Sequence, residues 1–176
     1  MLLCAVLGLS VRSYAQTFTL KSPDIGGQFT AGYISNLFGC QGENASPALQ
    51  WNNPPAGTKS YAVTIYDPDA PTGSGWWHWV VIDIPPVTRS LSKNAGSALK
   101  HLLPEGSIQS QTDFGVPGYG GPCPPEGDKP HGYIITIYAL DIAKLGASQT
   151  AAPALVGFML NKHLISKASL IVYSKR

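Results

Sequence analysis

Two aspartates and a histidine lie close together in the chain, around the end of one apolar segment and the start of the next. Asp67 and Asp69 belong to Asp-Pro-Asp-Ala-Pro, and His78 follows within Trp-Trp-His-Trp. Taken singly, an aspartate next to proline is usually a turn residue, and a histidine among tryptophans is usually a core residue. Together they place carboxylates near an imidazole, a combination that serves proton transfer and ligand binding. We therefore regard this segment as one half of a candidate polar site.

A glycine- and proline-rich segment, residues 115–125 (Gly-Val-Pro-Gly-Tyr-Gly-Gly-Pro-Cys-Pro-Pro), is the second chemically notable stretch. Glycine lets main-chain N–H groups approach a ligand closely, and proline fixes the shape of the loop. Such a loop can line an anion site with main-chain donors. It is not a P-loop, because no Gly-Lys-Ser/Thr ending and no helix follow. The segment continues to His131, which lies just before another apolar run.

The residues that carry this chemistry are flanked by segments with the composition of strands. Three segments rich in β-branched and aromatic residues predict strands at 61–66, 76–84 and 133–140. The second is almost continuously apolar, which predicts burial on both of its faces. Shorter strand candidates are residues 18–20, 48–51 and 170–173.

Two segments are predicted to be helical, residues 95–102 and, with a stronger pattern, residues 152–164. Thr150 is the expected N-cap of the second helix, and Pro153 fits its first turn. Strands dominate, and no strand–helix–strand alternation occurs, so we expect an all-β or β-rich domain of two packed sheets. The apolar face of the second helix is expected to comprise Leu155, Phe158 and Met159.

The composition excludes several classes of protein. The chain has 176 residues, of which 12% are charged, and its formal charge is +2. This length predicts a single domain with a substantial core. The near-neutral charge argues against a nucleic-acid partner, because nucleic-acid binding needs a basic patch. After the N-terminal residues no apolar run approaches the roughly 20 residues that a membrane-spanning helix requires, so we expect no membrane span.

The N-terminal residues have the pattern of a signal peptide. Residues 2–9 are an uninterrupted apolar run, and Ser13-Tyr14-Ala15 places small side chains where a signal peptidase cleaves. We predict a signal peptide at residues 1–15, a mature domain at residues 16–176, and a periplasmic or secreted location. An ordinary N-terminal strand is the alternative, but polar residues follow the apolar run too soon for a buried element.

Cleavage after residue 15 would leave two of the three cysteines, Cys40 and Cys123. Two thiols in an oxidising compartment favour a disulfide, and a pair of unbonded buried thiols is the alternative. A bond between these cysteines would restrict the unfolded chain by roughly 4 to 5 kcal/mol in the chain-entropy model.

Taken together, the motifs resemble the phosphatidylethanolamine-binding protein family, and more closely its bacterial, Raf-kinase-inhibitor-like branch. The resemblance runs from Phe18 to Tyr173. It implies a large antiparallel sheet packed on a smaller one, with a few peripheral helices. The motifs that carry it are Asp67-Pro-Asp-Ala-Pro, the Trp-His-Trp segment, Gly-Tyr-Gly-Gly-Pro-Cys-Pro-Pro with the later Pro-His, and Gly42-Glu-Asn-Ala-Ser-Pro47.

The same resemblance implies a small pocket for phosphate-like anions, including phosphoethanolamine head groups. An aspartate such as Asp67 beside an imidazole would favour the imidazolium, which attracts an anion. Asp69 is the candidate partner for an ammonium group on the same ligand. The residues expected to bind the ligand are Asp67, Asp69, His78, Gly121, Pro122, Pro124, Pro125, His131 and Tyr133.

We therefore expect an exported binding protein for a small anionic or phosphorylated ligand. The alternative is an interaction protein that inhibits a kinase or protease through the rim of the pocket, as some members of the family do. Symmetric dimers among bacterial relatives make a homodimer a further candidate. An enzyme is the third class, but the sequence has no His-Glu-x-x-His motif, no Gly-x-Ser-x-Gly motif and no nucleophile paired with a base. We predict no catalysis, no metal and no cofactor.

Overall fold

The protein is described from a computed structural model in which residues 16–176 are placed. The predicted signal peptide, residues 1–15, lies outside the described residues. No helix in the described part is long and apolar enough to cross a membrane. The elements are β1 (Thr19–Lys21), β2 (Leu49–Asn52), β3 (Ser60–Asp67), β4 (Trp76–Ile84), β5 (Ser90–Leu91), β6 (Ile108–Gln109), β7 (His131–Leu140), α1 (Pro153–Lys162) and β8 (Leu164–Ser174).

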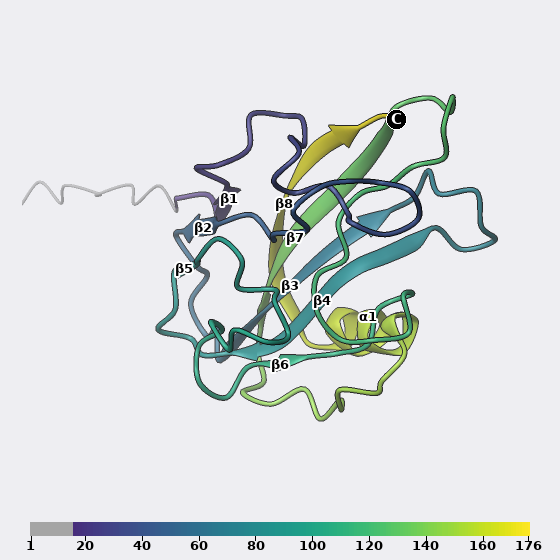
Figure 1. Cartoon of the computed structure of the whole chain (residues 1–176). Helices are drawn as coiled ribbons and strands as arrows, with labels where there is room; N and C mark the ends of the chain where they lie inside the picture. The colour runs from purple at the N-terminus through teal and green to yellow at the C-terminus, as the bar shows by residue number, and fades with distance from the viewer. Residues whose placement is uncertain (1–15) are drawn as a thin grey trace, which may run out of the picture.

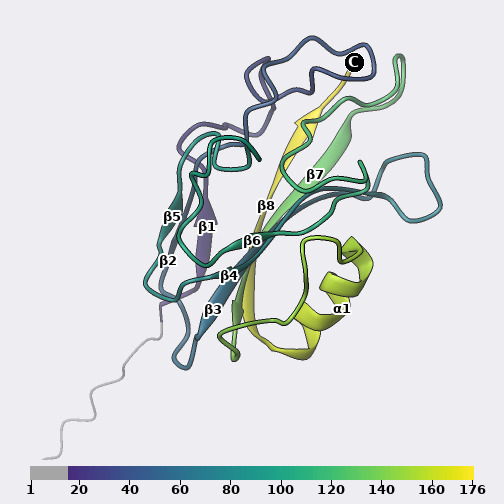
Figure 2. The same ribbon diagram turned by 60° about the horizontal axis from the view of Figure 1, so that its bottom comes forward.

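The strands form two antiparallel sheets, which confirms the predicted β-rich class with a large sheet on a smaller one. The larger sheet has the order β6-β4-β3-β7-β8, and the smaller has the order β1-β2-β5. The smaller sheet covers one face of the larger sheet, and α1 covers the opposite face (Figure 1 and Figure 2). The larger sheet is therefore the central layer of the molecule.

Apolar side chains fill the space on both faces of this central layer. Trp51 from β2 and Trp79 from β4 are fully buried between the two sheets. On the opposite face, Val156 and Leu160 of α1 pack in a second apolar cluster with Ile82 of β4. Because β4 contributes to both clusters, its continuously apolar composition is explained, and its predicted burial on both faces is confirmed.

The predicted bounds are close to the observed ones for most strands and wrong for the last strand. β4 matches its prediction, and β1, β2, β3 and β7 lie within two residues of theirs. β8 extends over Leu164–Ser174, and its first half alternates between half-buried and exposed residues. Serine and lysine on its exposed positions hide the strand pattern, because β8 is an edge strand of the larger sheet. The two-residue strands β5 and β6 were not predicted.

The helix predicted at residues 95–102 is absent, and the segment forms turns. His101 has a left-handed φ of 47°, which ends any α-helix there. The Gly96 carbonyl accepts a hydrogen bond from the Tyr119 amide at 2.9 Å instead of from a residue within the segment. Tertiary bonding thus overrides a weak local propensity.

The second predicted helix is present as α1, but its predicted cap was wrong. Ala152 occupies the N-cap position, and no side chain caps the helix. The Thr150 hydroxyl lies 3.0 Å from the hydroxyl of Ser148 instead. Pro153 in the first turn is confirmed; its missing N–H removes one of the donors that a cap would have satisfied.

The predicted apolar face of α1 was wrong for two of its three residues, because only Met159 packs against the apolar cluster on the helix side. Leu155 and Phe158 are 52% and 69% exposed, whereas Val156 and Leu160 are fully buried. Each of these two pairs marks one apolar stripe along the helix, so the sequence pattern did not show which stripe is buried. The direction in which the helix meets the sheet selects the stripe that includes Val156 and Leu160.

Candidate functional site

The end of β3 and the beginnings of β4 and β7 meet at one end of the larger sheet. Because β3 is antiparallel to both neighbours, its last residue, Asp67, lies beside their first residues. β7 begins with His131 and carries Tyr133 two positions later. Strand pairing thus brings together residues that are more than sixty positions apart in the chain.

A β-bulge in β4 directs His78 into this site. Tyr66 pairs with Trp77, but Ile65 pairs with Trp79, so His78 is an extra residue without a partner on β3. A bulge changes the direction in which a side chain points. Trp79 therefore enters the core between the sheets, Trp77 packs on the helix side, and His78 is buried at the end of the sheet.

His131 is held between two carboxylates. Its Nδ1 lies 2.8 Å from Oδ2 of Asp67, and its Nε2 lies 3.3 Å from Oδ2 of Asp128. Burial by itself lowers the pKa of His131, but the two carboxylates outweigh burial and raise this pKa above its ordinary 6.5. The two carboxylates therefore favour the protonated form of His131, and both of its ring nitrogens are engaged.

His78 has the opposite character. Its Nδ1 donates a hydrogen bond to the carbonyl of Gly120 at 2.7 Å, which leaves Nε2 of the neutral ring as an acceptor. Burial lowers the pKa of His78 to about 4, although the carbonyl of Gly120 and the charge of Asp67 oppose that effect. The ring is consequently neutral at pH 7.

The hydroxyl group of Tyr133 is a donor beside the two histidines. The Tyr133 ring centroid lies 5.0 Å from that of His78 and 6.5 Å from that of His131. Burial, and next the negative charge of Asp67, raise the pKa of Tyr133. The hydroxyl therefore keeps its proton throughout the ordinary pH range and can donate it in a hydrogen bond.

The glycine- and proline-rich loop is fixed by hydrogen bonds of its own amides. Gly120 N–H donates to the His78 carbonyl at 2.9 Å, and Gly121 N–H donates to the side-chain oxygen of Asn44 at 2.7 Å. Asn44 also donates to the Tyr119 carbonyl at 3.3 Å. At these two glycines the expectation of main-chain donors facing an anion was wrong. Asn44 is instead a positioning residue, which the sequence indicated only as part of a longer motif.

The site residues surround a cavity of about 230 Å³. Within residues 16–176, no group of three or more His, Cys, Asp or Glu side chains is arranged to hold a metal ion. Most of the predicted ligand-binding residues line the cavity. They are Asp67, His78, Gly121, Pro124, Pro125, His131 and Tyr133.

Two of the predicted residues do not line this cavity. The Asp69 carboxylate accepts hydrogen bonds from Lys129 Nζ at 2.7 Å and from Gly132 N–H at 2.9 Å. Both bonds lower the pKa of Asp69, and Lys129 occupies the place that a ligand ammonium group would take. Pro122 lines a neighbouring hollow, and its carbonyl accepts the amide of Ser35 at 3.0 Å.

Three aromatic rings line the outer part of the cavity, those of Phe38, Trp76 and Phe114. The Phe114 centroid lies 6.0 Å from that of Phe38, 5.5 Å from that of Trp76 and 5.4 Å from that of His78. A side chain at Gly120 would overlap the Phe114 ring, so that glycine makes room for it. Neither phenylalanine was predicted. The available signals were the position of Phe114 directly before the loop and that of Phe38 two residues before a cysteine.

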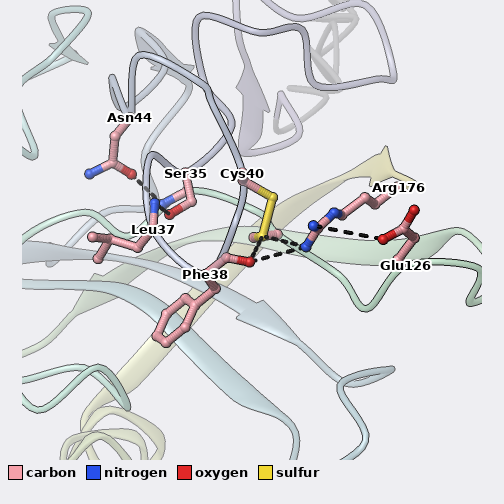
Figure 3. Close-up of a disulfide and its surroundings, with 9 residues drawn as sticks. Ser35, Leu37, Phe38, Cys40, Asn44, Glu126 and Arg176 are labelled. Carbon is pink, nitrogen blue, oxygen red and sulfur yellow. Dashed lines mark hydrogen bonds and ion pairs between the residues drawn. A yellow bond between two sulfur atoms is a disulfide. The ribbon is translucent and has the colours of Figure 1, made fainter.

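A disulfide joins Cys40 to Cys123, which confirms the predicted bond over two unbonded thiols; their Cα atoms are 6.0 Å apart. Cys123 lines the cavity, so the bond attaches the segment that carries Phe38 to the rim (Figure 3). Arg176 adds a second attachment. Its Nη1 donates to the Phe38 carbonyl at 3.1 Å, and its Nη2 lies 3.9 Å from Oε2 of Glu126.

Comparison with known families and proteins places these features in context. A family model described as phosphatidylethanolamine-binding protein matches residues 25–175. The Escherichia coli (strain K12) protein YbcL is 46% identical over 164 residues, which cover 92% of this chain and 90% of YbcL. YbhB from the same organism is 49% identical over 138 residues, covering 78% of this chain and 86% of YbhB. A Mycobacterium tuberculosis protein named as a lipoprotein, LppC, is 36% identical over 130 residues, covering 73% of this chain and 58% of LppC.

The fold is also found in solved structures. The crystal structure of Escherichia coli YbcL, described as a new member of the mammalian PEBP family, superposes with a TM-score of 0.88 at 45% identity. That match covers 90% of this chain and 98% of the YbcL chain. The structure of CT736 from Chlamydia trachomatis gives a TM-score of 0.74 at 27% identity, covering 90% of this chain and 97% of CT736.

Proposed function

The chain belongs to the phosphatidylethanolamine-binding protein family, and from this premise we propose that it binds a small phosphate-like anion, either free or as a phosphorylated head group. The binding site is the cavity lined by His78, His131 and Tyr133, and the role is binding without catalysis. The observation that carries the proposal is the buried pair of histidines near the Tyr133 ring, one with a pKa that carboxylates raise and one that burial keeps neutral.

The charges in the cavity favour one ionisation state of such a ligand. His131 supplies positive charge, but Asp67 and Asp128 on its two nitrogens repel a doubly charged phosphate. A singly protonated phosphate reduces this repulsion, and its O–H group can donate to the acceptor Nε2 of the neutral His78 ring. The preferred ligand therefore carries both an anionic oxygen and an acidic hydroxyl.

An NMR titration with inorganic phosphate, phosphoethanolamine and acetate tests this function. We expect saturable shifts of the His78 and His131 ring signals. His78→Ala and His131→Ala should each weaken phosphoethanolamine binding at least about tenfold, because the first removes a hydrogen-bond partner of the ligand and the second removes positive charge from the cavity. His163→Ala is the matched control, because His163 pairs with Asp141 outside the cavity. Unshifted ring signals, or unchanged affinity in both cavity variants, would refute the proposal.

We also propose that the mature protein is exported. The disulfide supports export, because such bonds persist mainly in oxidising compartments, and one relative bears the name of a lipoprotein. N-terminal sequencing of the protein purified from cells that express the whole chain should give Gln16 as the first residue. A cytoplasmic protein that retains Met1 would contradict this proposal.

A further inference from the structure

The outer part of the cavity offers chemistry that a phosphate does not use. The side chains of Phe38 and Phe114 carry no hydrogen-bonding group, and Trp76 adds a large aromatic ring. At roughly 30 Å³ per atom, the volume of a water molecule in the liquid, the five heavy atoms of a phosphate fill at most about 150 Å³. The cavity measures about 230 Å³. Room therefore remains beside the rings for further atoms of the ligand.

The position of Phe38 departs from the burial and the backbone conformation that a phenylalanine prefers. Its side chain is 69% exposed, although an aromatic ring is more stable when buried. Its backbone has a φ of 55°, a region that bulky side chains rarely adopt. Neither burial nor backbone preference accounts for a phenylalanine at the mouth of the cavity.

Covalent and polar contacts hold the Phe38 segment in this exposed position. The Cys40–Cys123 disulfide attaches it to the rim, and the Cys40 amide donates to the Leu37 carbonyl at 3.0 Å. In Figure 3 the Phe38 ring points away from the disulfide, while its carbonyl faces the Arg176 guanidinium. The ring is therefore in place before a ligand arrives, which lowers the entropy lost on binding.

We propose that Phe38, together with Phe114 and Trp76, forms a second subsite that takes a planar apolar group attached to the anion. This inference rests on the proposed function, because the histidines must hold the anion for its substituent to reach the rings. Phe114 connects the two subsites, since its ring contacts both His78 and Phe38. Aromatic rings pack well at centroid distances of about 4.5–7 Å, so a flat ring suits this mouth better than a flexible polar chain.

Isothermal titration calorimetry with inorganic phosphate, phosphoethanolamine and phenyl phosphate tests the inference. The parent should bind phenyl phosphate at least about tenfold more tightly than phosphoethanolamine, an advantage of about 1.4 kcal/mol. In Phe38→Ala this ratio of affinities should fall below about threefold. Phe158→Ala is the matched control and should keep the parental ratio, because Phe158 is also 69% exposed but lies on α1, outside the cavity.

The disulfide offers an independent variant. Cys40→Ser/Cys123→Ser keeps the Phe38 ring but releases its segment from the rim, so the ratio should fall in this double variant as well; circular dichroism checks that it is folded. Equal affinities for the three ligands in the parent, or a parental ratio in Phe38→Ala, would overturn the inference and leave the proposed function standing. Failure of all three ligands to bind would overturn the proposed function itself.

Discussion

At the scale of single residues, the site depends on two histidines whose surroundings move their pKa values in opposite directions. Carboxylates raise the pKa of His131, so its pairing stabilises the fold fully below pH 6.5 and less as the pH rises through the folded pKa. For His78 the sign reverses, because burial lowers its pKa to about 4. The contribution of the neutral buried ring to the free energy of unfolding is fully present above pH 6.5. Roughly 3 kcal/mol of this free energy is lost as the pH falls to 4.

Histidine ring titration by NMR measures these two pKa values directly. We expect His78 to titrate near pH 4 and His131 above pH 6.5. Asp67→Asn removes a charged partner and should lower the pKa of His131 by about one unit or more. A shared pKa for the two cavity histidines would contradict the description of the site.

The affinity for phosphoethanolamine should depend on pH in a defined direction. The second pKa of a phosphate ester is about 6, and His78 is neutral above pH 4. Above pH 6 the ligand must therefore take up one proton when it binds, because its singly protonated form is the preferred one. Calorimetry should show an affinity that falls about tenfold between pH 7 and pH 8 and levels off below pH 6. Sulfate, which has no titrating proton in this range, is the control for ionic effects. Tighter phosphoethanolamine binding at pH 8 than at pH 6 would disprove the preference for the protonated ligand.

At the scale of the elements, the ends of the central strands build the site, and α1 supports the opposite face of the sheet. The bulge at His78 belongs to the sheet and not to the loop, because it arises from the register between β3 and β4. α1 is attached through Val156 and Leu160, while Leu155 and Phe158 remain outside the cluster.

Substitutions on the two stripes of α1 should therefore differ in effect. Leu160→Ala should lower the free energy of unfolding by about 2–5 kcal/mol, because it leaves a cavity in the apolar cluster on the helix side. Phe158→Ala should change the same quantity by less than about 0.5 kcal/mol, because Phe158 is exposed. Urea unfolding followed by circular dichroism provides both values. A larger loss of unfolding free energy for Phe158→Ala than for Leu160→Ala would show that the stripe containing Phe158 holds the helix on the sheet.

At the scale of the whole molecule, the disulfide connects two loops whose cysteines are 83 positions apart. Cys40→Ser/Cys123→Ser should lower the free energy of unfolding by about 4–5 kcal/mol, because it frees the unfolded chain from a long closed loop. Urea unfolding without reductant measures the difference. With a reductant present, the parent should become as unstable as the double variant. A loss below about 1 kcal/mol would mean that the bond serves only to place the rim.

The sequence by itself determined the β-rich class, the positions of the central strands and the polar residues at their ends. These features follow from local composition, since β-branched and aromatic runs predict strands and prolines and glycines predict where they stop. It also favoured a bond between Cys40 and Cys123, which the structure contains, because only these two cysteines follow residue 15. Seven of the fourteen residues that line the cavity were named before any contact was known, through the resemblance of the motifs to a known family.

Only the tertiary structure decided how those residues are used. It assigned Asp67 to His131, placed Lys129 on Asp69, and turned His78 inward through a bulge. It also brought Phe38 to the mouth of the cavity. Each of these outcomes depends on register, burial and charge between segments far apart in the chain, and a pKa or an exposed fraction has no value until those segments pack together.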